Sequence, residues 1–281
     1  AICQTHQDLV KVIMKKLIIA LLIIPAASAR FITLTPESMG FVASIIGILS
    51  SILGLYTAYF FDTPTGPSIV CVATLFFFFE RSKVSSRFHT PMTMIAVVCL
   101  MSSIHYFFVK NLWVVSGTAP TLLRYIDWFL NFPMLVLIFY AMLMSVVKVK
   151  QGMFWRLLVG TLVFVVAGFL GAAGYMSKTL GFIVWLAGWL YILGELYVGE
   201  AGRANARCGN ENVQMVFFSN RLIITIGWAI YPMGYFIEHL GGGIDPNSVN
   251  VIYNLADFLN KIVFGLIIYK AAIQDMRVNG Q

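Results

Sequence analysis

The chain alternates long apolar runs with short polar connections. Runs rich in leucine, isoleucine, valine and phenylalanine fall at 67–80, 91–109, 121–146, 153–175, 180–199, 214–239 and 248–270. An apolar segment of about 20 residues is long enough to cross the hydrocarbon core of a bilayer as an α-helix. The pattern therefore predicts an all-α membrane protein, a bundle of seven transmembrane helices in a lipid bilayer.

The composition agrees with a membrane protein, and the charges indicate its orientation. Charged residues make up only 11% of the chain, against about a quarter in soluble domains. Lysines and arginines cluster in the connections at 81–87, 148–156 and 203–221 and after the last run, at 270–277, all on one side of the bundle. This bias places the C-terminus in the cytoplasm. It also explains the net charge of +7 without a nucleic-acid partner.

The first 63 residues form a segment distinct from the seven-helix part, residues 64–281. Met14–Ala29 has the basic start, apolar core and small-residue end of a signal peptide, whereas 41–61 is long enough to be an extra span. One or two additional N-terminal hydrophobic segments are therefore expected. The stretch 16–79, which includes LIIALLIIPAASARF, resembles the C-terminal part of the permease subunits of metal-ion ABC transporters. This resemblance implies a gene fusion joined within the first of the seven helices.

Lys261 and Asp257 lie near the middle of the last apolar run, in VIYNLADFLNKIVFGLIIYKA. An unpaired charge at that depth costs about 3 kcal/mol, so both residues are candidates for a functional site. Their i, i+4 spacing places the carboxylate one turn from the amine on the same helix face. A lysine removed from water is a nucleophile that forms a Schiff base with an aldehyde. A purely structural ion pair between helices is the alternative.

A second charged pair, Arg124 and Asp127, lies in the third run. With Lys261 and Asp257 it makes a neutral set of two cations and two carboxylates, which costs less in lipid than any member alone. A plain salt-bridge network between helices has the same charge balance. Five aromatic residues lie near the middles of their runs: Tyr125, Trp128, Trp189, Trp228 and Tyr231. Tryptophan otherwise prefers the membrane interface, so these rings indicate a slot for a flat polyene or ordinary helix packing.

Three segments resemble the proteorhodopsins, a type of microbial rhodopsin: RYIDW at 124–128, GWAIYPMGY at 227–235 and IYNLADFLNKIVFGLII at 252–268. The resemblance implies a seven-helix bundle of the microbial rhodopsin type in a bacterial inner membrane, with all-trans retinal on Lys261. It implies a proton acceptor and counterion at Asp127 and a second counterion at Asp257. It also implies roles for Arg124 on the extracellular exit side and for His105 beside the acceptor. The implied retinal pocket is lined by Tyr125, Trp128, Leu135, Trp189, Trp228, Tyr231 and Pro232, and Leu135 matches a colour-tuning position that implies green absorption.

The resemblance implies a light-driven outward proton pump rather than an enzyme, and homo-oligomers, yet two positions depart from the pumping pattern. Asn131 stands where the family has a threonine, and an amide there still hydrogen-bonds the acceptor. Ile138 replaces the carboxylic proton donor, so reprotonation from the cytoplasm requires another group, such as Glu80 or Glu195, or water. A photosensory rhodopsin that signals through a separate transducer protein, and an inward proton pump, are the alternatives.

Three polar residues, Glu238, His239 and Asp245, lie in the connection before the last run. They are candidates for proton release or for binding a divalent cation such as zinc. Three solvated loop residues are the alternative.

Overall fold

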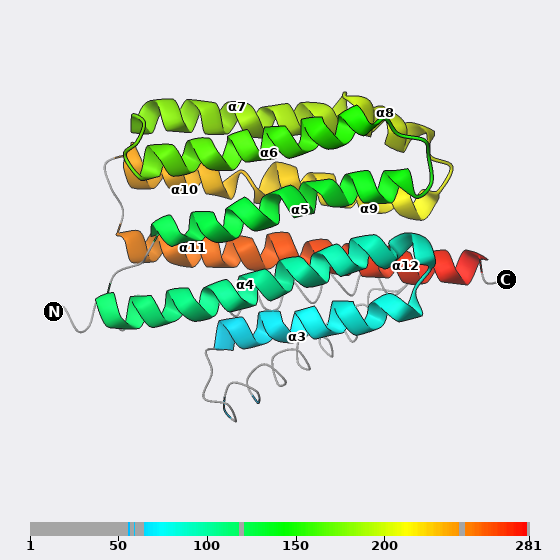
Figure 1. The fold of residues 1–281 in the computed structure, drawn as a ribbon, viewed down its shortest axis with the longest axis horizontal. Helices are drawn as coiled ribbons and strands as arrows, with labels where there is room; N and C mark the ends of the chain where they lie inside the picture. Colours follow the sequence, from blue (N-terminus) through cyan, green and yellow to red (C-terminus); the bar gives the residue numbers. More distant parts are fainter. Residues whose placement is uncertain (1–55, 57–58, 60–64, 118–120, 242–244, 280–281) are drawn as a thin grey trace, which may run out of the picture.

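The chain folds into a bundle of long helices that lie side by side (Figure 1). The computed structural model describes Tyr56, Tyr59 and residues 65–117, 121–241 and 245–279. Every regular element in these residues is a helix, which confirms the all-α prediction. The expectations for residues 1–63, a signal peptide or extra spans, lie outside the described residues except at the two single tyrosines.

Each of the seven apolar runs forms a helical rod. The first five are α3 (Thr65–Glu80), α4 (His89–Ser116), α5 (Arg124–Met144), α6 (Gln151–Ala172) and α7 (Lys178–Tyr197). The sixth rod contains α9 (Glu211–Leu222) and α10 (Ile230–His239), the seventh contains α11 (Pro246–Phe258) and α12 (Phe264–Asn279), and a short α8 (Glu200–Arg207) precedes α9. Within the described residues, six rods are long and apolar enough to span a membrane. The helix α3 adds a shorter rod of 16 residues.

Local sequence signals set several helix ends. Gly117 ends α4 with a positive φ of 68°, a conformation that glycine adopts without steric cost, and its N–H donates to Trp113 O at 2.8 Å. Ser177 caps α7 by accepting from Leu180 N. Asp245 caps α11 just before a proline at its first turn.

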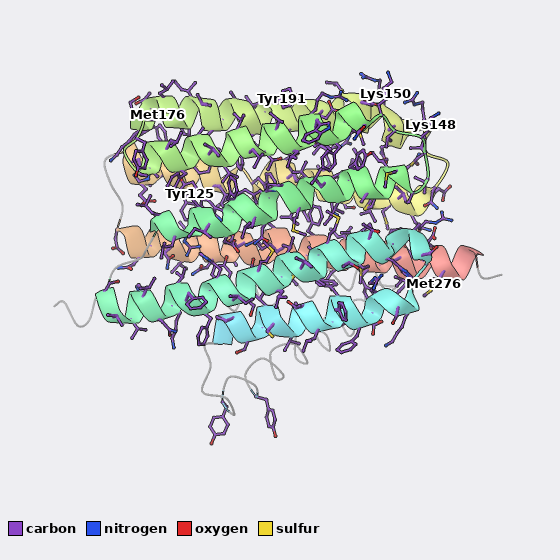
Figure 2. All side chains as sticks on the ribbon, viewed as in Figure 1. Tyr125, Lys148, Lys150, Met176, Tyr191 and Met276 are labelled. Atoms are coloured by element: carbon purple, nitrogen blue, oxygen red, sulfur yellow. The ribbon has the colours of Figure 1, made fainter. Side chains whose placement is uncertain are left out.

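The order of the helices in the bundle follows the order of the chain. The helix α3 packs on α4, α4 on α5, α5 on α6 and α6 on α7, while α10 contacts α7 and α11, and α12 contacts α9, α4 and α3. Figure 2 shows Lys148, Lys150 and Met276 at one end of the bundle and Met176 at the opposite end. The basic connections and the end of the last helix therefore share one end, as the positive-inside pattern predicts.

The sixth and seventh rods differ from the continuous α-helices that the sequence predicts. Each contains a π-helical turn near its middle, η4 (Ile223–Gly227) and η5 (Leu259–Val263), and the two turns are in contact. The Trp228 N–H donates to Ile223 O five residues earlier, at 3.3 Å. Lys261 lies within the second turn. A π-helical turn holds an extra residue and frequently marks a functional site.

Candidate functional site

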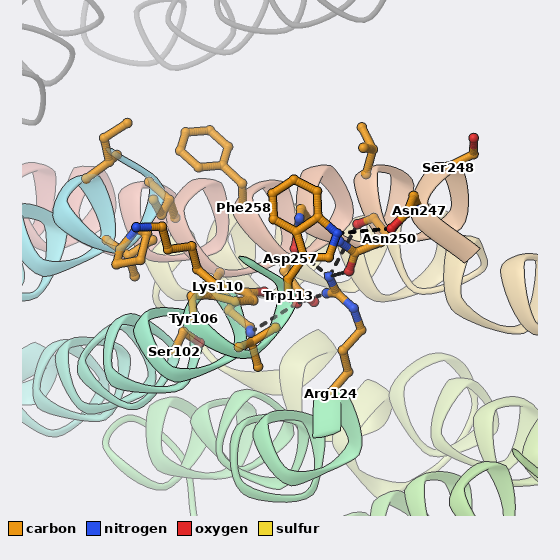
Figure 3. Close-up of a pocket in the computed structure, with 18 of the residues that line it drawn as sticks. Ser102, Tyr106, Lys110, Trp113, Arg124, Asn247, Ser248, Asn250, Asp257 and Phe258 are labelled. Atoms are coloured by element: carbon orange, nitrogen blue, oxygen red, sulfur yellow. Dashed lines mark hydrogen bonds and ion pairs between the residues drawn. The ribbon is translucent and has the colours of Figure 1, made fainter. Parts of the chain in front are cut away.

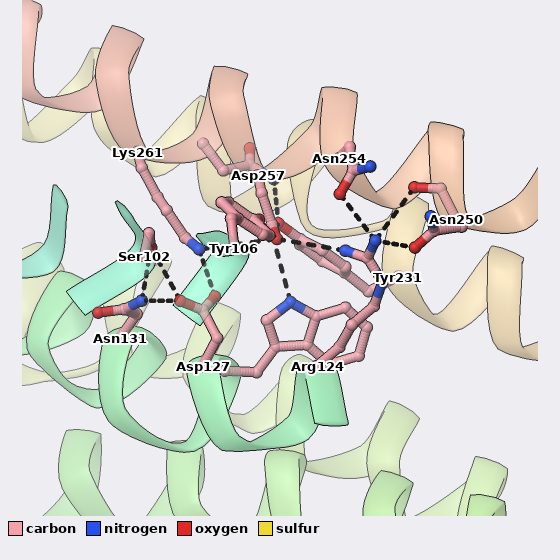
Figure 4. Close-up of polar contacts among 12 residues, drawn as sticks. Ser102, Tyr106, Arg124, Asp127, Asn131, Tyr231, Asn250, Asn254, Asp257 and Lys261 are labelled. Atoms are coloured by element: carbon pink, nitrogen blue, oxygen red, sulfur yellow. Dashed lines mark hydrogen bonds and ion pairs between the residues drawn. The ribbon is translucent and has the colours of Figure 1, made fainter. Parts of the chain in front are cut away.

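Lys261 is buried in the middle of the bundle, where it is paired with two carboxylates (Figure 4). Its side chain is 2% exposed, and Nζ lies 2.5 Å from Oδ2 of Asp127 on α5. The same nitrogen lies 3.6 Å from Oδ2 of Asp257, one turn earlier in its own rod, and 5.5 Å from the ring centroid of Tyr106 on α4. The structure thus brings together the lysine and the two carboxylates that the sequence singles out, so each charge is offset by its neighbours.

Asp127 is held by two polar side chains besides the lysine. Its Oδ1 accepts from Asn131 Nδ2 at 2.7 Å and from Ser102 Oγ at 2.9 Å, and Asn131 Nδ2 also donates to Ser102 Oγ at 2.8 Å. Asp127 and Asn131 are four residues apart, so they lie on one face of α5. The prediction that Asn131 still hydrogen-bonds Asp127 is confirmed. These bonds orient the carboxylate so that Oδ2 faces Lys261.

Asp257 accepts from a larger set of donors. Tyr231 OH and Trp128 Nε1 donate to Oδ1 at 2.6 Å and 3.2 Å, and the Tyr106 hydroxyl donates to Oδ2. Nη1 of Arg124 lies 3.8 Å from Oδ2. Because these donors come from three other rods, the Asp257 carboxylate is fixed in orientation and ties the middle of the bundle together.

Arg124 borders a cavity of about 600 Å³ between α4 and α11 (Figure 3). Its Nη2 donates to Asn254 Oδ1 at 2.7 Å, to Asn250 O at 3.3 Å and also to Asn250 Oδ1. The cavity lining includes both Lys110 and Lys261. It lies toward the end of the bundle away from the basic connections, because Lys110 is in the last turns of α4 and the two asparagines are in the first turns of α11. The arginine therefore stands between the buried ions and one end of the bundle.

His105 shares a second cavity, of about 420 Å³, with Asp127. The rest of the lining is apolar and comes from α4, α5 and the short turn that precedes α5: Met101, Ile104, Phe108, Val109, Leu123, Ile126 and Leu130. The Nε2 atom of His105 is buried and has no hydrogen-bond partner among the described residues. The structure thus places His105 beside the predicted acceptor, and the two share a cavity rather than a hydrogen bond.

The aromatic residues predicted for the pocket lie together in the hydrophobic core. Tyr125, Trp128, Leu135, Trp228, Tyr231 and Pro232 are buried, and Trp189 is half-buried against them. The Trp128 ring lies 5.0 Å from the rings of both Tyr125 and Tyr231, and Trp189 Nε1 donates to Ile224 O at 3.0 Å. The predicted rings therefore form one cluster beside the buried ions.

The side chains around Lys261, next to this cluster, have the chemistry that retinal requires. A buried amine next to two carboxylates, bordered by aromatic side chains, suits an apolar aldehyde that is joined to lysine and leaves a cation on its nitrogen. The indole Nε1 of Trp228 and Oδ1 of Asn260 are buried without a hydrogen-bond partner in the described residues. The buried amine, its two carboxylates and the neighbouring rings thus agree with the cofactor that the resemblance implies.

The residues proposed for a metal site are not brought together. No group of three His, Cys, Asp or Glu side chains in the described residues is placed to bind a metal ion. Asp245 instead caps α11, where its Oδ2 accepts from Ser248 N at 3.2 Å, and the His239 ring packs 4.5 Å from the ring of Tyr235. The candidate cation site with Glu238 is therefore not assembled in the described residues, where Asp245 caps a helix and the His239 ring packs on Tyr235.

Position 138, where the resemblance implies a carboxylic proton donor, holds an isoleucine. Ile138 is 0% exposed. Glu195 is bound by Arg156, with Nε at 3.0 Å and Nη2 at 3.1 Å from its oxygens, and Glu80 is paired with Lys83 at 2.7 Å. Both glutamates thus belong to ion pairs close to the ends of α7 and α3.

Four further residues belong to the site but carry no charge that marks them in the sequence: Ser102, Tyr106, Asn250 and Asn254. A usable signal exists for the two asparagines, because 250, 254, 257 and 261 are separated by four, three and four residues and share one helix face. Ser102 and Tyr106 are also four residues apart on α4. An uncharged polar residue can be assigned to the site only when the charged residues that it faces are known.

Comparison with known proteins identifies the family. Residues 59–275 match the bacteriorhodopsin-like proteins, and the chain belongs to this family. A blue-light absorbing proteorhodopsin of Gamma-proteobacterium Hot 75m4 is 42% identical over 205 residues, which cover 72% of this chain and 81% of that protein. A green-light absorbing proteorhodopsin of Gamma-proteobacterium EBAC31A08 is 41% identical over 204 residues, with 72% and 82% covered.

A solved structure gives the same result. The blue light-absorbing proteorhodopsin from Med12 is 35% identical, with a TM-score of 0.65, and the match covers 75% of this chain and 95% of that one. The resemblance to microbial rhodopsins and the fold class are thereby confirmed.

The N-terminal resemblance is also confirmed. Residues 8–83 match the ABC 3 transport family. ZnuB of Haemophilus influenzae, a high-affinity zinc uptake system membrane protein, is 54% identical over 61 residues, which cover 21% of this chain and 23% of that protein. This match and the rhodopsin match overlap at 59–83, which includes all of α3.

Proposed function

We propose that this protein is a light-driven outward proton pump with all-trans retinal on Lys261. The observation that carries the proposal is the position of Lys261 Nζ, 2.5 Å from Asp127 and 3.6 Å from Asp257 in a buried site. The names of the two proteorhodopsin relatives support a function driven by light.

Each residue of the site has a separate role in proton transfer. Retinal, when joined to Lys261, supplies light absorption and changes the direction and proton affinity of the lysine nitrogen. Asp127 accepts the proton at Oδ2, because this oxygen is the nearest acceptor to Nζ. Ser102 and Asn131 hold the other oxygen and keep Oδ2 aligned. Asp257 keeps its hydroxyl and indole donors and serves as the second counterion.

We place the C-terminus in the cytoplasm, in a bacterial inner membrane. The basic connections lie at the end that includes Lys148 and Lys150, and such residues concentrate on the cytoplasmic side. The cavity beside Arg124 then faces the outside. A proton accepted by Asp127 leaves through this side, where Arg124, Asn250 and Asn254 provide a polar route.

Proton uptake from the cytoplasm is the atypical part of the proposed cycle. Ile138 holds no proton, and the nearest glutamates in sequence are engaged in ion pairs. We propose that water reaching the site from the cytoplasm reprotonates Lys261. Uptake without a donor is slow, and this favours a photosensory rhodopsin with a separate transducer as the second candidate function.

Two further properties belong to the proposal. Exposed apolar side chains such as Ile104, Phe108 and Ile126 surround the cavity of His105, and we propose that homo-oligomers cover them. Leu135, fully buried in the aromatic cluster, supports absorption in the green. The activity is transport or signalling rather than enzymatic turnover.

Illumination of a cell suspension that expresses the full chain, supplied with retinal, tests the proposal. The external pH is followed with and without a protonophore. Acidification that the protonophore abolishes is the expected result, and Lys261→Ala should remove both this signal and the visible absorption band.

Each other outcome contradicts the outward pump. Alkalinisation on illumination indicates inward transport, and a visible band without any pH change indicates a sensor. A visible band that persists in Lys261→Ala refutes the assignment of retinal to this lysine.

A further inference from the structure

Phe132 of α5 connects the two tryptophan rings of the aromatic cluster. Its ring is stacked on Trp128, with centroids 5.8 Å apart and planes 12° apart, and lies 4.5 Å from Trp228 with planes 31° apart. Phe132 and Trp228 are 0% exposed and Trp128 is 1% exposed. Three rings from two rods thus form one buried stack.

A second phenylalanine covers the same side of Trp228. The Phe164 ring of α6 is stacked on this indole, 5.7 Å away with planes 18° apart. Its centroid lies 5.6 Å from that of Phe132, a separation too small for rings on opposite faces of one indole. The Trp228 face directed toward α5 is therefore occupied by two phenylalanine rings.

This arrangement conflicts with a polyene in the same place. A flat chain held between two aromatic rings needs about 3.5–4.0 Å on each side, so the rings that hold it stand roughly 7 Å apart. The 4.5 Å between Phe132 and Trp228 leaves no such layer. The Phe132 ring contacts both Trp228 and Tyr231, and the Tyr231 hydroxyl bonds Asp257 beside Lys261. A chain that extends from Lys261 along Tyr231 toward Trp228 therefore meets the Phe132 ring.

We propose that Phe132 is a positioning residue that closes the chromophore slot and must swing out before a long aldehyde binds. The inference rests on the proposed function and adds a property that the charged site does not have. In the closed state the Phe132 ring contacts both tryptophans. Opening the slot breaks these contacts and costs their free energy, so only a small fraction of the protein is open and ready to bind at any moment.

The chemistry at Lys261 itself is not affected by the closed slot. The amine forms a bond to the aldehyde carbon, and the carbonyl oxygen leaves as water, so an imine and one water result. A short aldehyde completes this step without reaching Phe132. A long polyene aldehyde requires the open state, and its observed rate is reduced by the open fraction.

The test uses the full chain produced without retinal and measures adduct formation on Lys261. All-trans retinal is added, samples are reduced with borohydride at intervals, and the modified peptide is quantified by mass spectrometry. Phe132→Ala should form the adduct faster by about ten- to a hundredfold, since the ring contacts of Phe132 with Trp128 and Trp228, two of its four, no longer oppose opening. Phe132→Leu, which keeps more of the core filled, should give a smaller increase.

Two controls separate slot closure from general loosening. Phe139→Ala removes a ring on the same helix that is 1% exposed and makes two ring pairs, with Phe217 and Phe264. Its adduct rate should match that of the unaltered protein. The five-carbon aldehyde 3-methylbut-2-enal should modify Lys261 at the same rate in all variants, and the melting temperature of each retinal-free variant reports its folding.

The outcomes are distinct. Equal retinal rates for the unaltered protein, Phe132→Leu and Phe132→Ala overturn the inference and leave the proposed function intact. An equal acceleration with the five-carbon aldehyde or in Phe139→Ala also overturns it, because the effect is then general. Adducts with retinal only in the Phe132 variants support the inference and refute the retinal pump. No adduct with either aldehyde in any variant refutes both.

Discussion

Replacing Gly227 by alanine tests whether the contact between the two π-helical turns supports the site. A Cβ on Gly227 would overlap the carboxamide of Asn260, which is 1% exposed. Asn260 Nδ2 donates to Tyr231 OH at 3.0 Å, and this hydroxyl donates to Asp257 at 2.6 Å. The substitution therefore displaces a side chain that is two hydrogen bonds away from a carboxylate beside Lys261.

Three contributions set the size of the expected effect on the free energy of unfolding. Overpacking a close-packed interior costs about 1–3 kcal/mol, and the lost hydrogen bond between Asn260 and Tyr231 costs about 1 kcal/mol. Alanine favours the helix over glycine by roughly 0.5–1 kcal/mol, which offsets part of the loss. The expected net loss for Gly227→Ala is about 1–3 kcal/mol.

Gly194 provides a matched control and Asn260 a partner for a double-mutant cycle. A Cβ on Gly194 in α7 meets nothing within 4 Å, so Gly194→Ala should be neutral or stabilising by less than about 1 kcal/mol. Unfolding in a titration of detergent-solubilised protein with SDS, followed by tryptophan fluorescence, measures all variants. Asn260→Ala removes the obstacle, so the cycle should show a coupling of about 1–2 kcal/mol. Equal stability of the two alanine variants, or strict additivity in the cycle, would refute this reasoning.

Three further predictions use the same unfolding assay or thiol labelling. Asn131→Ala removes a donor from Asp127 and should lower the free energy of unfolding by about 1–2 kcal/mol. Asn131→Thr keeps a donor and should lose less than half of that amount. Equal losses for the two variants would contradict a stabilising hydrogen bond between residue 131 and Asp127. Arg156→Ala leaves Glu195, which is 8% exposed, without its bidentate partner and should cost about 1 kcal/mol, because Arg156 is partly exposed. Arg156→Lys should recover little, and full recovery would show that charge alone suffices. Burial raises the pKa of the Cys208 thiol, so at neutral pH maleimide should label it at least about tenfold more slowly than free cysteine, and an equal rate would show that the α8–α9 connection is open.

Hydropathy predicts the fold well because the bilayer itself selects the pattern. Every backbone polar group inside lipid must be bonded within its own segment, so a long apolar run has few alternatives to a helix. The predicted run 153–175 and the helix Gln151–Ala172 differ by only two or three residues at each end. The same argument gives no information on the π-helical turns, because an extra residue in one turn leaves the apolar run unchanged.

The charged core of the site was predictable for a related reason. Lys261 and Asp127 are conspicuous in an apolar run because an isolated charge there is costly. Phe132 carries no such signal, since one phenylalanine in a membrane helix resembles any other. Its contacts with Trp128 and Trp228 depend on how α5 and the sixth rod face each other, which is settled by packing.

The π-helical turn at Leu259–Val263 has a consequence for how the seventh rod relates to its neighbours. One additional residue rotates every later side chain by about 100° relative to a continuous α-helix. Asn250 and Asn254 before the turn, and Asp275 after it, therefore lie on faces whose directions are set separately. The half before the turn is fitted to Arg124. The half after it is fitted to α9 and to the residue that caps α9, Asn210, which donates to Asp275 at 2.9 Å. The side-chain directions of the seventh rod are therefore those of two shorter helices joined end to end. A substitution in one half can change the partners of that half during evolution without rotating the side chains of the other half.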